Sequence, residues 1–158
     1  MQRSFLVPVL VFLALAALAC STTRPIQIDP ATCQERADDD VLPRFNGSTW
    51  ELENGAVRCG VPVHVGDRID EWAVFFTRYI AGAAVEVRLQ RLEAVSQLRV
   101  DVPPVRSDSL SMLGYFPLGA ALEEPELVNE DHSYGLLVTG LSGPGDRLGV
   151  MTVWVTSQ

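Results

Sequence analysis

The feature that most constrains the fold of this chain is a period of two in its apolar side chains. Across residues 57–65, every odd-numbered position carries Val or Cys, with Arg, Gly, Pro and His between them. Alternation of this kind is typical of a β-strand with one face in the core and one face in water. Pro62 has no backbone N–H for a ladder hydrogen bond, so the pattern predicts a strand near the edge of a sheet.

The same alternation returns later in the chain and predicts an all-β protein. It recurs in residues 85–89, 98–102, 134–138 and 148–154. Residues 72–76 are apolar on both faces, as in a central strand, and turn-forming residues separate the segments. We therefore expect a small antiparallel β-sandwich over residues 41–158, in a jelly-roll or immunoglobulin-like arrangement. Residues 118–128 could hold a short helix, which Pro125 limits.

The first 20 residues have the form of an export signal. Arg3 follows the amino terminus, and an unbroken apolar run covers residues 5–19. This run is shorter than the roughly 20 apolar residues of a spanning helix. Residues 16–20, Ala-Ala-Leu-Ala-Cys, resemble a bacterial lipobox. The resemblance implies that Cys20 carries a lipid and that residues 1–19 are removed as a signal peptide. Cleavage as an ordinary secretory signal stays open as the alternative.

The cysteine count agrees with lipidation. The chain has 3 Cys, which is an odd number for an exported protein. If Cys20 carries a lipid, Cys33 and Cys59 remain, and exported proteins fold in a compartment that permits disulfides. We therefore expect a Cys33–Cys59 disulfide, with two free buried thiols as the alternative.

Residues 20–40 are expected to form the lipidated N-terminus and a linker. The segment contains Pro25 and Pro30 and ends in an acidic run at residues 38–40, a composition typical of a tether that lets a domain stand away from the bilayer. The acidic run is expected to be a solvated turn, with a cation site as the alternative. Ser21, where an Asp would signal inner-membrane retention, favours the periplasmic face of the outer membrane or the cell surface.

The charge of the chain excludes several classes of function. The formal net charge is −8, and all 12 basic residues are Arg, without a cluster. A nucleic-acid-binding surface needs clustered cations, so nucleic acid is not an expected partner. Because the chain has no Lys, a Walker A phosphate loop, Schiff-base chemistry and Ser-x-x-Lys acylation are excluded as well.

No catalytic constellation is visible in the sequence. The 2 His residues, His64 and His132, lie far apart, and neither an H-E-x-x-H nor a G-x-S-x-G motif is present. Carboxylates gather at residues 123–126 and 130–131, where a solubilising loop is expected rather than a glycosidase pair. We therefore expect a protein that is not an enzyme and assign no catalytic residue.

Two groups of side chains could bind ligands. Asp67, Asp70 and Glu71 form a tight group of hard oxygen donors, as calcium prefers, although surface acidity explains them without a metal. No other metal or cofactor is expected. The aromatic side chains could stack on sugar rings if they were exposed. They are Trp50, Trp72, Trp154, Tyr115 and Phe116, of which Trp72 and Trp154 are expected in the core.

Three segments resemble the bacterial pre-peptidase C-terminal domain, a β-sandwich module of secreted proteins. Residues 65–72 are similar to its opening Gly-Asp and Asp-aromatic pairs, and residues 81–89 to its Ala-Gly turn and alternating strand. Residues 134–140 are similar to its late Tyr-x-Leu-x-Val strand, whereas the family's Tyr near the closing strand is missing from residues 150–154. The resemblance implies a sandwich that supports secretion or binding, sometimes with calcium, and not catalysis.

These observations together predict a membrane-anchored envelope lipoprotein with a noncatalytic role in binding or assembly. Its expected partners are the membrane, through the lipid on Cys20, and an envelope protein or a polysaccharide. An accessory lipoprotein of a secretion or envelope machine is the alternative function. A secreted hydrolase is the third.

Overall fold

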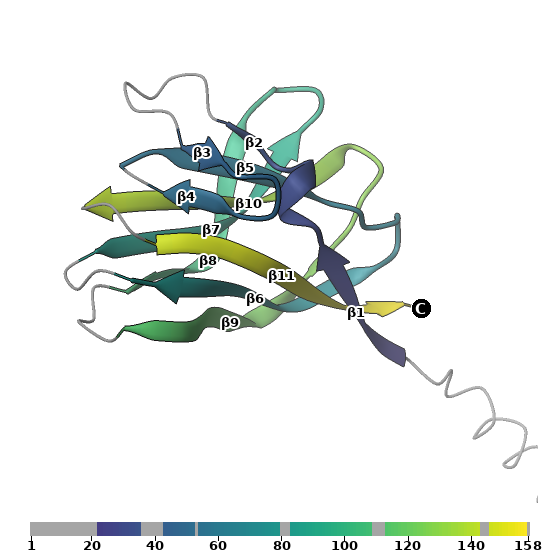
Figure 1. The fold of residues 1–158 in the computed structure, drawn as a ribbon. Coiled ribbons are helices and arrows are strands. Elements are labelled where there is room, and N and C mark those ends of the chain that lie inside the picture. The colour runs from purple at the N-terminus through teal and green to yellow at the C-terminus, as the bar shows by residue number, and fades with distance from the viewer. Residues whose placement is uncertain are drawn as a thin grey trace, which may run out of the picture.

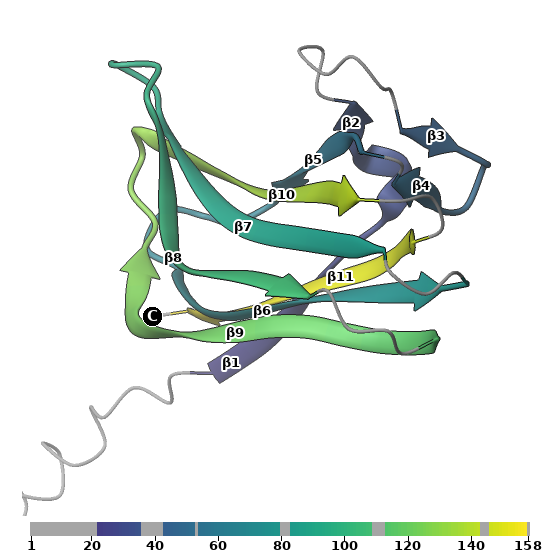
Figure 2. The ribbon, with the colours of Figure 1, turned by 90° about the vertical axis from the view of Figure 1, so that its left-hand side faces the viewer.

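The computed structural model describes residues 22–35, 43–52, 54–79, 83–108, 113–142 and 146–157. In these segments, two antiparallel sheets pack face to face around one core (Figures 1 and 2). The predicted all-β antiparallel sandwich is therefore confirmed. No helix among the described residues is long and apolar enough to cross a membrane. The predicted signal peptide, Cys20 and the acidic run at 38–40 lie outside the described residues.

The first sheet has 6 strands and contains both ends of the described chain. Its path runs from β3 through β4, β11 and β6 to β9, and β1 pairs with the part of β11 that extends beyond β4. The strands are β1 Thr22–Ile28, β3 Arg44–Phe45, β4 Trp50–Leu52, β6 Arg68–Arg78, β9 Gly114–Leu127 and β11 Asp146–Ser157. Because β6 lies between β11 and β9, the prediction of a central strand at residues 72–76 is confirmed.

The second sheet has 5 strands in the order β2, β5, β10, β7, β8. They are β2 Gln34–Glu35, β5 Ala56–Val61, β7 Ala84–Glu93, β8 Arg99–Asp108 and β10 His132–Ser142. From β5 to β7, and again from β8 to β11, each connection passes from one sheet to the other. This alternation is the jelly-roll arrangement, one of the two that the sequence predicted.

The core confirms most of the predicted inward side chains. Alternate residues of β5, β7 and β10 face the first sheet, and residues 72, 74 and 76 of β6 face the second. Full burial of one Val, Leu or Phe side chain stabilises the fold by about 1.5–3 kcal/mol. The fully buried positions include Val57, Cys59, Trp72, Val74, Phe76, Val87, Leu89, Leu136 and Val138.

β11 departs from the predicted alternation because it contains a β-bulge. The sequence predicted that every second residue from Leu148 to Trp154 faces the core. The pairing with β6 shifts its register between Leu148 and Met151, so Met151, Val153 and Val155 are buried instead. An extra residue in one strand moves all later side chains to the opposite face. The core position predicted for Trp154 is therefore wrong, and its side chain lies half-buried on the outer face.

The helix considered for residues 118–128 is absent, and β9 occupies this stretch. Ala120 and Leu122 are buried while the residues between and beside them are exposed, which is the period of a strand. Antiparallel pairing with β6 over nearly the full length of β9 overrides the local helix propensity.

The predicted linker is wrong for its described part, residues 22–35. β1 pairs with β11 in a continuous register from Thr22 opposite Ser157 to Ile28 opposite Met151. Ile28 is buried in the core, and Pro25 is tolerated because β1 is an edge strand. The folded domain therefore includes residues that precede the predicted boundary at 41.

A short helix connects β1 of the first sheet to β2 of the second, and the predicted disulfide joins the end of this helix to β5. The 3-10 helix η1, Pro30–Thr32, begins after Asp29, whose side chain accepts a hydrogen bond from the Ala31 backbone N. Cys33 and Cys59 form the disulfide, which confirms that prediction and ties the end of η1 to β5. The indole of Trp50 donates a hydrogen bond of 2.7 Å to the Pro30 carbonyl.

Candidate binding groove

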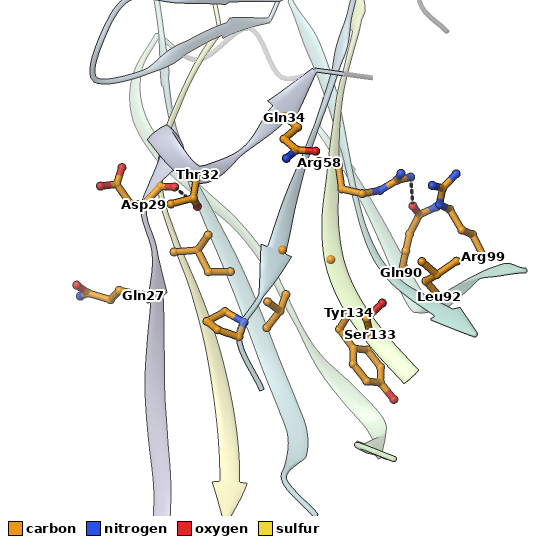
Figure 3. Close-up of a pocket in the computed structure, with 15 residues that line it drawn as sticks. Gln27, Asp29, Thr32, Gln34, Arg58, Gln90, Leu92, Arg99, Ser133 and Tyr134 are labelled. Atoms are coloured by element: carbon orange, nitrogen blue, oxygen red, sulfur yellow. Dashed lines mark hydrogen bonds between the residues drawn. The ribbon is translucent and has the colours of Figure 1, made fainter. Parts of the chain in front are cut away.

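A groove with a volume of about 740 Å³ opens on the outer face of the second sheet and on the open side between β1 and β5. This volume lies within the range of ligand clefts, roughly 300–1,000 Å³. Its wall comes from β1, η1 and β2, and its floor from β5, β10, β7 and β8 (Figure 3). Polar side chains line it from both sides, namely Gln27, Asp29, Thr32, Gln34, Arg58, Gln90, Arg99 and Ser133.

Two glycines keep the floor of the groove flat. Gly60 of β5 and Gly135 of β10 are direct partners in the antiparallel pairing. A Cβ on Gly60 would meet no atom within 4 Å, so the space above it is open. A Cβ on Gly135 would lie 3.5 Å from Cγ of Arg58, so the stem of that arginine crosses the strand over this glycine.

A ladder of polar side chains continues the floor across three strands. Arg58 of β5 donates a hydrogen bond of 2.8 Å to Oε1 of Gln90 on β7. Gln90 in turn donates one of 2.7 Å to Asp101 on β8. Arg88 donates to the other oxygen of Asp101 at 2.9 Å and to Glu86 at 2.6 Å. Each side chain is therefore held in a fixed orientation by its neighbour before any ligand arrives.

The far side of the groove belongs to the β7–β8 hairpin. Arg99 is the direct partner of Leu92, and both line the groove. Arg99 precedes Asp101 by two residues on the same face of β8, so its guanidinium lies near Gln90 (Figure 3). Figure 2 shows this hairpin bending upward from the sheet, which makes the outer face concave. The groove thus presents two guanidinium groups, Arg58 and Arg99, beside the amide of Gln90.

Tyr134 closes one end of the groove from the core side. Its hydroxyl donates a hydrogen bond of 2.9 Å to Glu126, which also accepts one of 2.8 Å from Arg91. Burial, and then the bond to Glu126, raises the pKa of Tyr134 well above its ordinary value, so the phenol stays neutral. Hydrogen bonding to Glu126 likewise raises the pKa of Arg91. Tyr134, Glu126 and Arg91 therefore hold the edge of the sandwich together, and the phenol of Tyr134 does not exchange a proton near neutral pH.

The residues proposed as calcium ligands have other partners. Both carboxylate oxygens of Asp67 are occupied, since Oδ2 accepts from Arg24 Nη2 at 3.0 Å and Oδ1 from Ser157 at 2.9 Å. Asp70 accepts from Thr156 at 2.6 Å. Within the described segments, no three His, Cys, Asp or Glu residues converge as a metal site. The structure therefore does not bring Asp67, Asp70 and Glu71 together as calcium ligands.

Neither histidine belongs to a nucleophilic arrangement in the described part of the chain. His132 Nδ1 lies 3.5 Å from the hydroxyl of Tyr134. Ser133 follows on β10 and therefore points to the opposite face, into the groove. The backbone N–H of His64 donates to Asp67 in the turn that follows β5. The polar side chains of the groove can hold and orient a ligand by hydrogen bonds.

The aromatic candidates are separated from the groove. Trp50 and Trp72 are buried, which confirms the core position expected for Trp72. Tyr115 is exposed and stacks on Phe75, with ring centres 5.5 Å apart, on the outer face of the first sheet. Phe116 is half-buried and packs on Phe76.

Sequence reasoning missed the groove residues. Arg58, Gln90 and Arg99 stand at the polar positions of alternating strands, where a solvated face is the usual outcome. Only the strand order brings Arg58 next to Gln90, which is 32 residues away in sequence. The paired glycines at the wet positions 60 and 135 were the one available signal, because a glycine inside a strand can mark the close approach of a ligand.

Comparison with known proteins identifies the fold and no family. No protein-family model matches the sequence, and no curated protein matches it. Among solved structures, a xylan-binding module of the CBM15 type has a TM-score of 0.53 at 8% identity, over 86% of this chain and 97% of the module. The CBM22-1 xylan-binding domain from Paenibacillus barcinonensis has a TM-score of 0.52 at 8% identity, over 89% of this chain and 99% of that domain.

A third match is part of a larger enzyme. The N-terminal CBM22-1 and GH10 modules of an endo-1,4-beta-D-xylanase from Clostridium thermocellum, complexed with xylohexaose, give a TM-score of 0.53 at 10% identity. The alignment covers 83% of this chain and 27% of that protein, so this chain spans about a quarter of its length. At such identities the likeness shows a shared jelly-roll fold.

Proposed function

We propose that this protein is a lipid-anchored envelope protein whose sandwich binds carbohydrate in the groove of the second sheet without catalysing a reaction. The observation that carries the proposal is the pre-oriented row of Arg58, Gln90 and Asp101 beside the open floor at Gly60.

The chemistry of this row suits sugars. A sugar ring presents neighbouring hydroxyls that both donate and accept hydrogen bonds. Planar amide and guanidinium groups can satisfy two such hydroxyls at once. The open space above Gly60 lets a sugar ring approach β5, and the volume of about 740 Å³ lies within the range of clefts that hold a small ligand. Because the network is already formed, little side-chain entropy is lost on binding.

The fold agrees with this function as an analogy. The CBM15 and Paenibacillus barcinonensis structures are described as xylan-binding. A shared fold does not carry a shared ligand, so the groove residues of this chain must supply the argument. The charged residues that line the groove are Arg58, Arg99 and Asp29. Because two of the three are cationic, acidic as well as neutral glycans belong among the candidate ligands.

The anchor is proposed from the lipobox resemblance of residues 16–20. Acyl chains on Cys20 would hold the domain in the cell envelope, at the periplasmic face of the outer membrane or at the cell surface. Cells grown with a labelled fatty acid should incorporate label into the wild-type chain and not into Cys20→Ser. Absence of label from the wild-type chain would contradict the anchor and favour ordinary secretion, and equal label in both chains would exclude Cys20 as the lipidated residue.

Titration calorimetry on the full-length chain in a zwitterionic detergent tests the carbohydrate proposal. The ligands are soluble xylan, mannan and polygalacturonate. We expect saturable binding of at least one of them and its loss in Gly60→Trp, whose indole would occupy the open floor. Ala121→Trp, at an exposed position of the first sheet, is the matched control and should bind normally. Absence of binding by wild type, or full binding by Gly60→Trp, would contradict the proposal.

An accessory role in a secretion or envelope machine is the alternative function, and the outer face of the first sheet favours it. Tyr79, Tyr115 and Val150 of this sheet and its margin are exposed, and exposed apolar side chains can contribute to protein contacts. Tyr115→Ser should then weaken capture of the partner while leaving carbohydrate binding unchanged. Retained capture by Tyr115→Ser would count against this alternative.

A further inference from the structure

We propose that the end of the sandwich at which β1 begins rests directly on the membrane surface that the acyl chains of Cys20 enter. This inference depends on the lipid anchor proposed above. Only Ser21 separates Cys20 from Thr22, the first residue of β1. The two steps from Cys20 to Thr22 span at most about 7 Å, so the anchor point lies close to a paired strand.

The start of β1 is fixed to the rest of the domain. Thr22 is the direct partner of Ser157, at the other end of the described chain. Arg24 forms an ion pair of 3.0 Å with the buried Asp67, and its Nε donates to Ser157 at 3.3 Å. Figures 1 and 2 both show the first residues of β1 beside the C-terminus. A strand held in this way does not serve as a tether.

Exposed apolar side chains gather at the same end. Arg68 is the direct partner of Leu127 on β9 and of Thr156 on β11. Leu127 is 48% exposed, and Val65, in the turn before β6, is 69% exposed. The backbone N–H of Gly66 donates to the Val128 carbonyl at 2.9 Å, which joins this turn to the end of β9. We call Thr22, Val65, Arg68, Leu127 and Ser157 the anchor end.

The anchor end has the chemistry of an interfacial contact. Val65 and Leu127 can enter the boundary between headgroups and acyl chains, where burial of apolar area is favourable. Arg68 can reach lipid phosphates with its guanidinium while its stem stays among apolar groups. The neighbouring carboxylates of Asp67 and Asp70 are engaged within the protein by Arg24, Ser157 and Thr156. Arg24 therefore compensates the charge of Asp67, and Thr156 orients the carboxylate of Asp70.

This orientation determines how far the candidate groove lies from the membrane surface. Gln27 lines the groove and stands five residues after Thr22 on β1. At about 3.4 Å per residue, Gln27 lies roughly 17 Å from Thr22 along the strand. The part of the groove wall at Gln27 would then stand beyond the headgroup region and remain accessible to an envelope polysaccharide.

Fluorescence quenching on vesicles tests the orientation. Val65→Cys and, as a control at the opposite end of the sandwich, Leu113→Cys each receive an environment-sensitive fluorophore on the added thiol in the full-length acylated chain. Leu113 is 62% exposed and precedes Gly114, the partner of Arg78 at the far end of β6. The chains are reconstituted into phosphatidylcholine vesicles that contain shallow doxyl-labelled lipid. We expect quenching at position 65 to exceed that at position 113 by about threefold or more, as for a group in the interface.

A linker variant separates contact from mere tethering. Insertion of about 20 Gly and Ser residues between Ser21 and Thr22, with a typical reach of about 25 Å, should abolish the excess quenching while the chain still floats with vesicles. Equal quenching at positions 65 and 113 in a floating chain would overturn the orientation and leave the anchor standing. A chain that does not float with vesicles would overturn the orientation and the anchor together.

Discussion

Arg78 and Asp146 form a bidentate ion pair inside the sandwich. Arg78 Nε lies 2.7 Å from Asp146 Oδ1, and Arg78 Nη2 lies 2.6 Å from Asp146 Oδ2. The two side chains are 0% and 1% exposed. The residues are direct partners on β6 and β11, and the guanidinium carbon lies 4.7 Å from the ring centre of Phe116. The pair therefore joins two central strands of the first sheet where water is excluded.

Removal of one partner of this pair should destabilise the protein strongly. Arg78→Met leaves the Asp146 carboxylate buried without its cation, and such changes cost about 3–5 kcal/mol. The control is Arg147→Met, which breaks an ion pair of 2.8 Å between side chains that are 41% and 38% exposed. That change should cost less than about 1 kcal/mol because water screens the pair. Urea unfolding measures both, and similar losses in the two variants would refute the role assigned to the buried pair.

The Cys33–Cys59 disulfide should contribute to stability and hold the groove wall. It closes a loop with a sequence separation of 26 residues that contains β2, β3 and β4. Loops of this size typically gain about 2–4 kcal/mol from the bridge. The double variant Cys33→Ser, Cys59→Ser should lose that amount in urea unfolding and should no longer respond to a reductant. A double variant as stable as the oxidised wild type would contradict this.

Two glycines on outer sheet faces should respond oppositely to the same substitution. A Cβ on Gly119 would lie 2.6 Å from the Trp72 carbonyl oxygen, and backbone must move to admit it. Gly119→Ala should therefore cost about 1–3 kcal/mol, as overpacked substitutions do. Gly60→Ala meets no atom within 4 Å and should leave the free energy of unfolding unchanged or slightly raised. Equal effects in thermal unfolding would show that the two environments are not as described.

The ion pair of Asp67 should make the fold sensitive to acid. Burial alone would raise the pKa of this carboxyl, but hydrogen bonds from the His64 backbone and Ser157, together with the charge of Arg24, outweigh it. They hold the pKa below its ordinary value of 3.8. A depressed folded-state pKa means that the unfolded state binds the proton more readily. The stabilisation is therefore complete above the ordinary pKa and is lost as the pH falls through the folded-state value.

Unfolding at a series of pH values tests this sign. The free energy of unfolding should fall more steeply below about pH 4 for the wild type than for Asp67→Asn, which has no proton to gain at this site. Parallel curves for the two proteins would exclude a depressed pKa at Asp67. Glu35→Gln, an exposed change on β2, is a control that should keep the wild-type slope.

The alternation of apolar residues was sufficient to predict the sandwich, because it reports directly which face of each strand is buried. It identified the inward residues of β5, β7 and β10 and the central strand around Trp72. It failed at β11 because a bulge after Leu148 leaves no local signal. It also failed at β1, since Thr-Thr-Arg-Pro-Ile-Gln-Ile has the composition of a linker until β11 supplies its pairing.

The candidate groove could not be predicted, for a related physical reason. A polar side chain at a wet position of a strand has the same local pattern whether it faces bulk water or a cleft. The ladder from Arg58 to Asp101 depends on the order β5, β10, β7, β8, which is set by long-range pairing. The Cys33–Cys59 bridge was predictable because the expected export and the odd count of cysteines constrain it without structural information. The lipidation of Cys20 and the resemblance to the pre-peptidase C-terminal domain stay predictions.

Amide chemical-shift mapping tests the central claim, that the second-sheet groove is the carbohydrate site. The full-length chain in detergent micelles is titrated with the polysaccharide that binds best in calorimetry, and two-dimensional proton–nitrogen spectra are followed. We expect shifts concentrated at the amides of Gly60, Gln90, Arg99 and Gly135, which line the groove. Shifts concentrated instead at Phe75, Tyr115 and Gly119, on the outer face of the first sheet, would contradict the account.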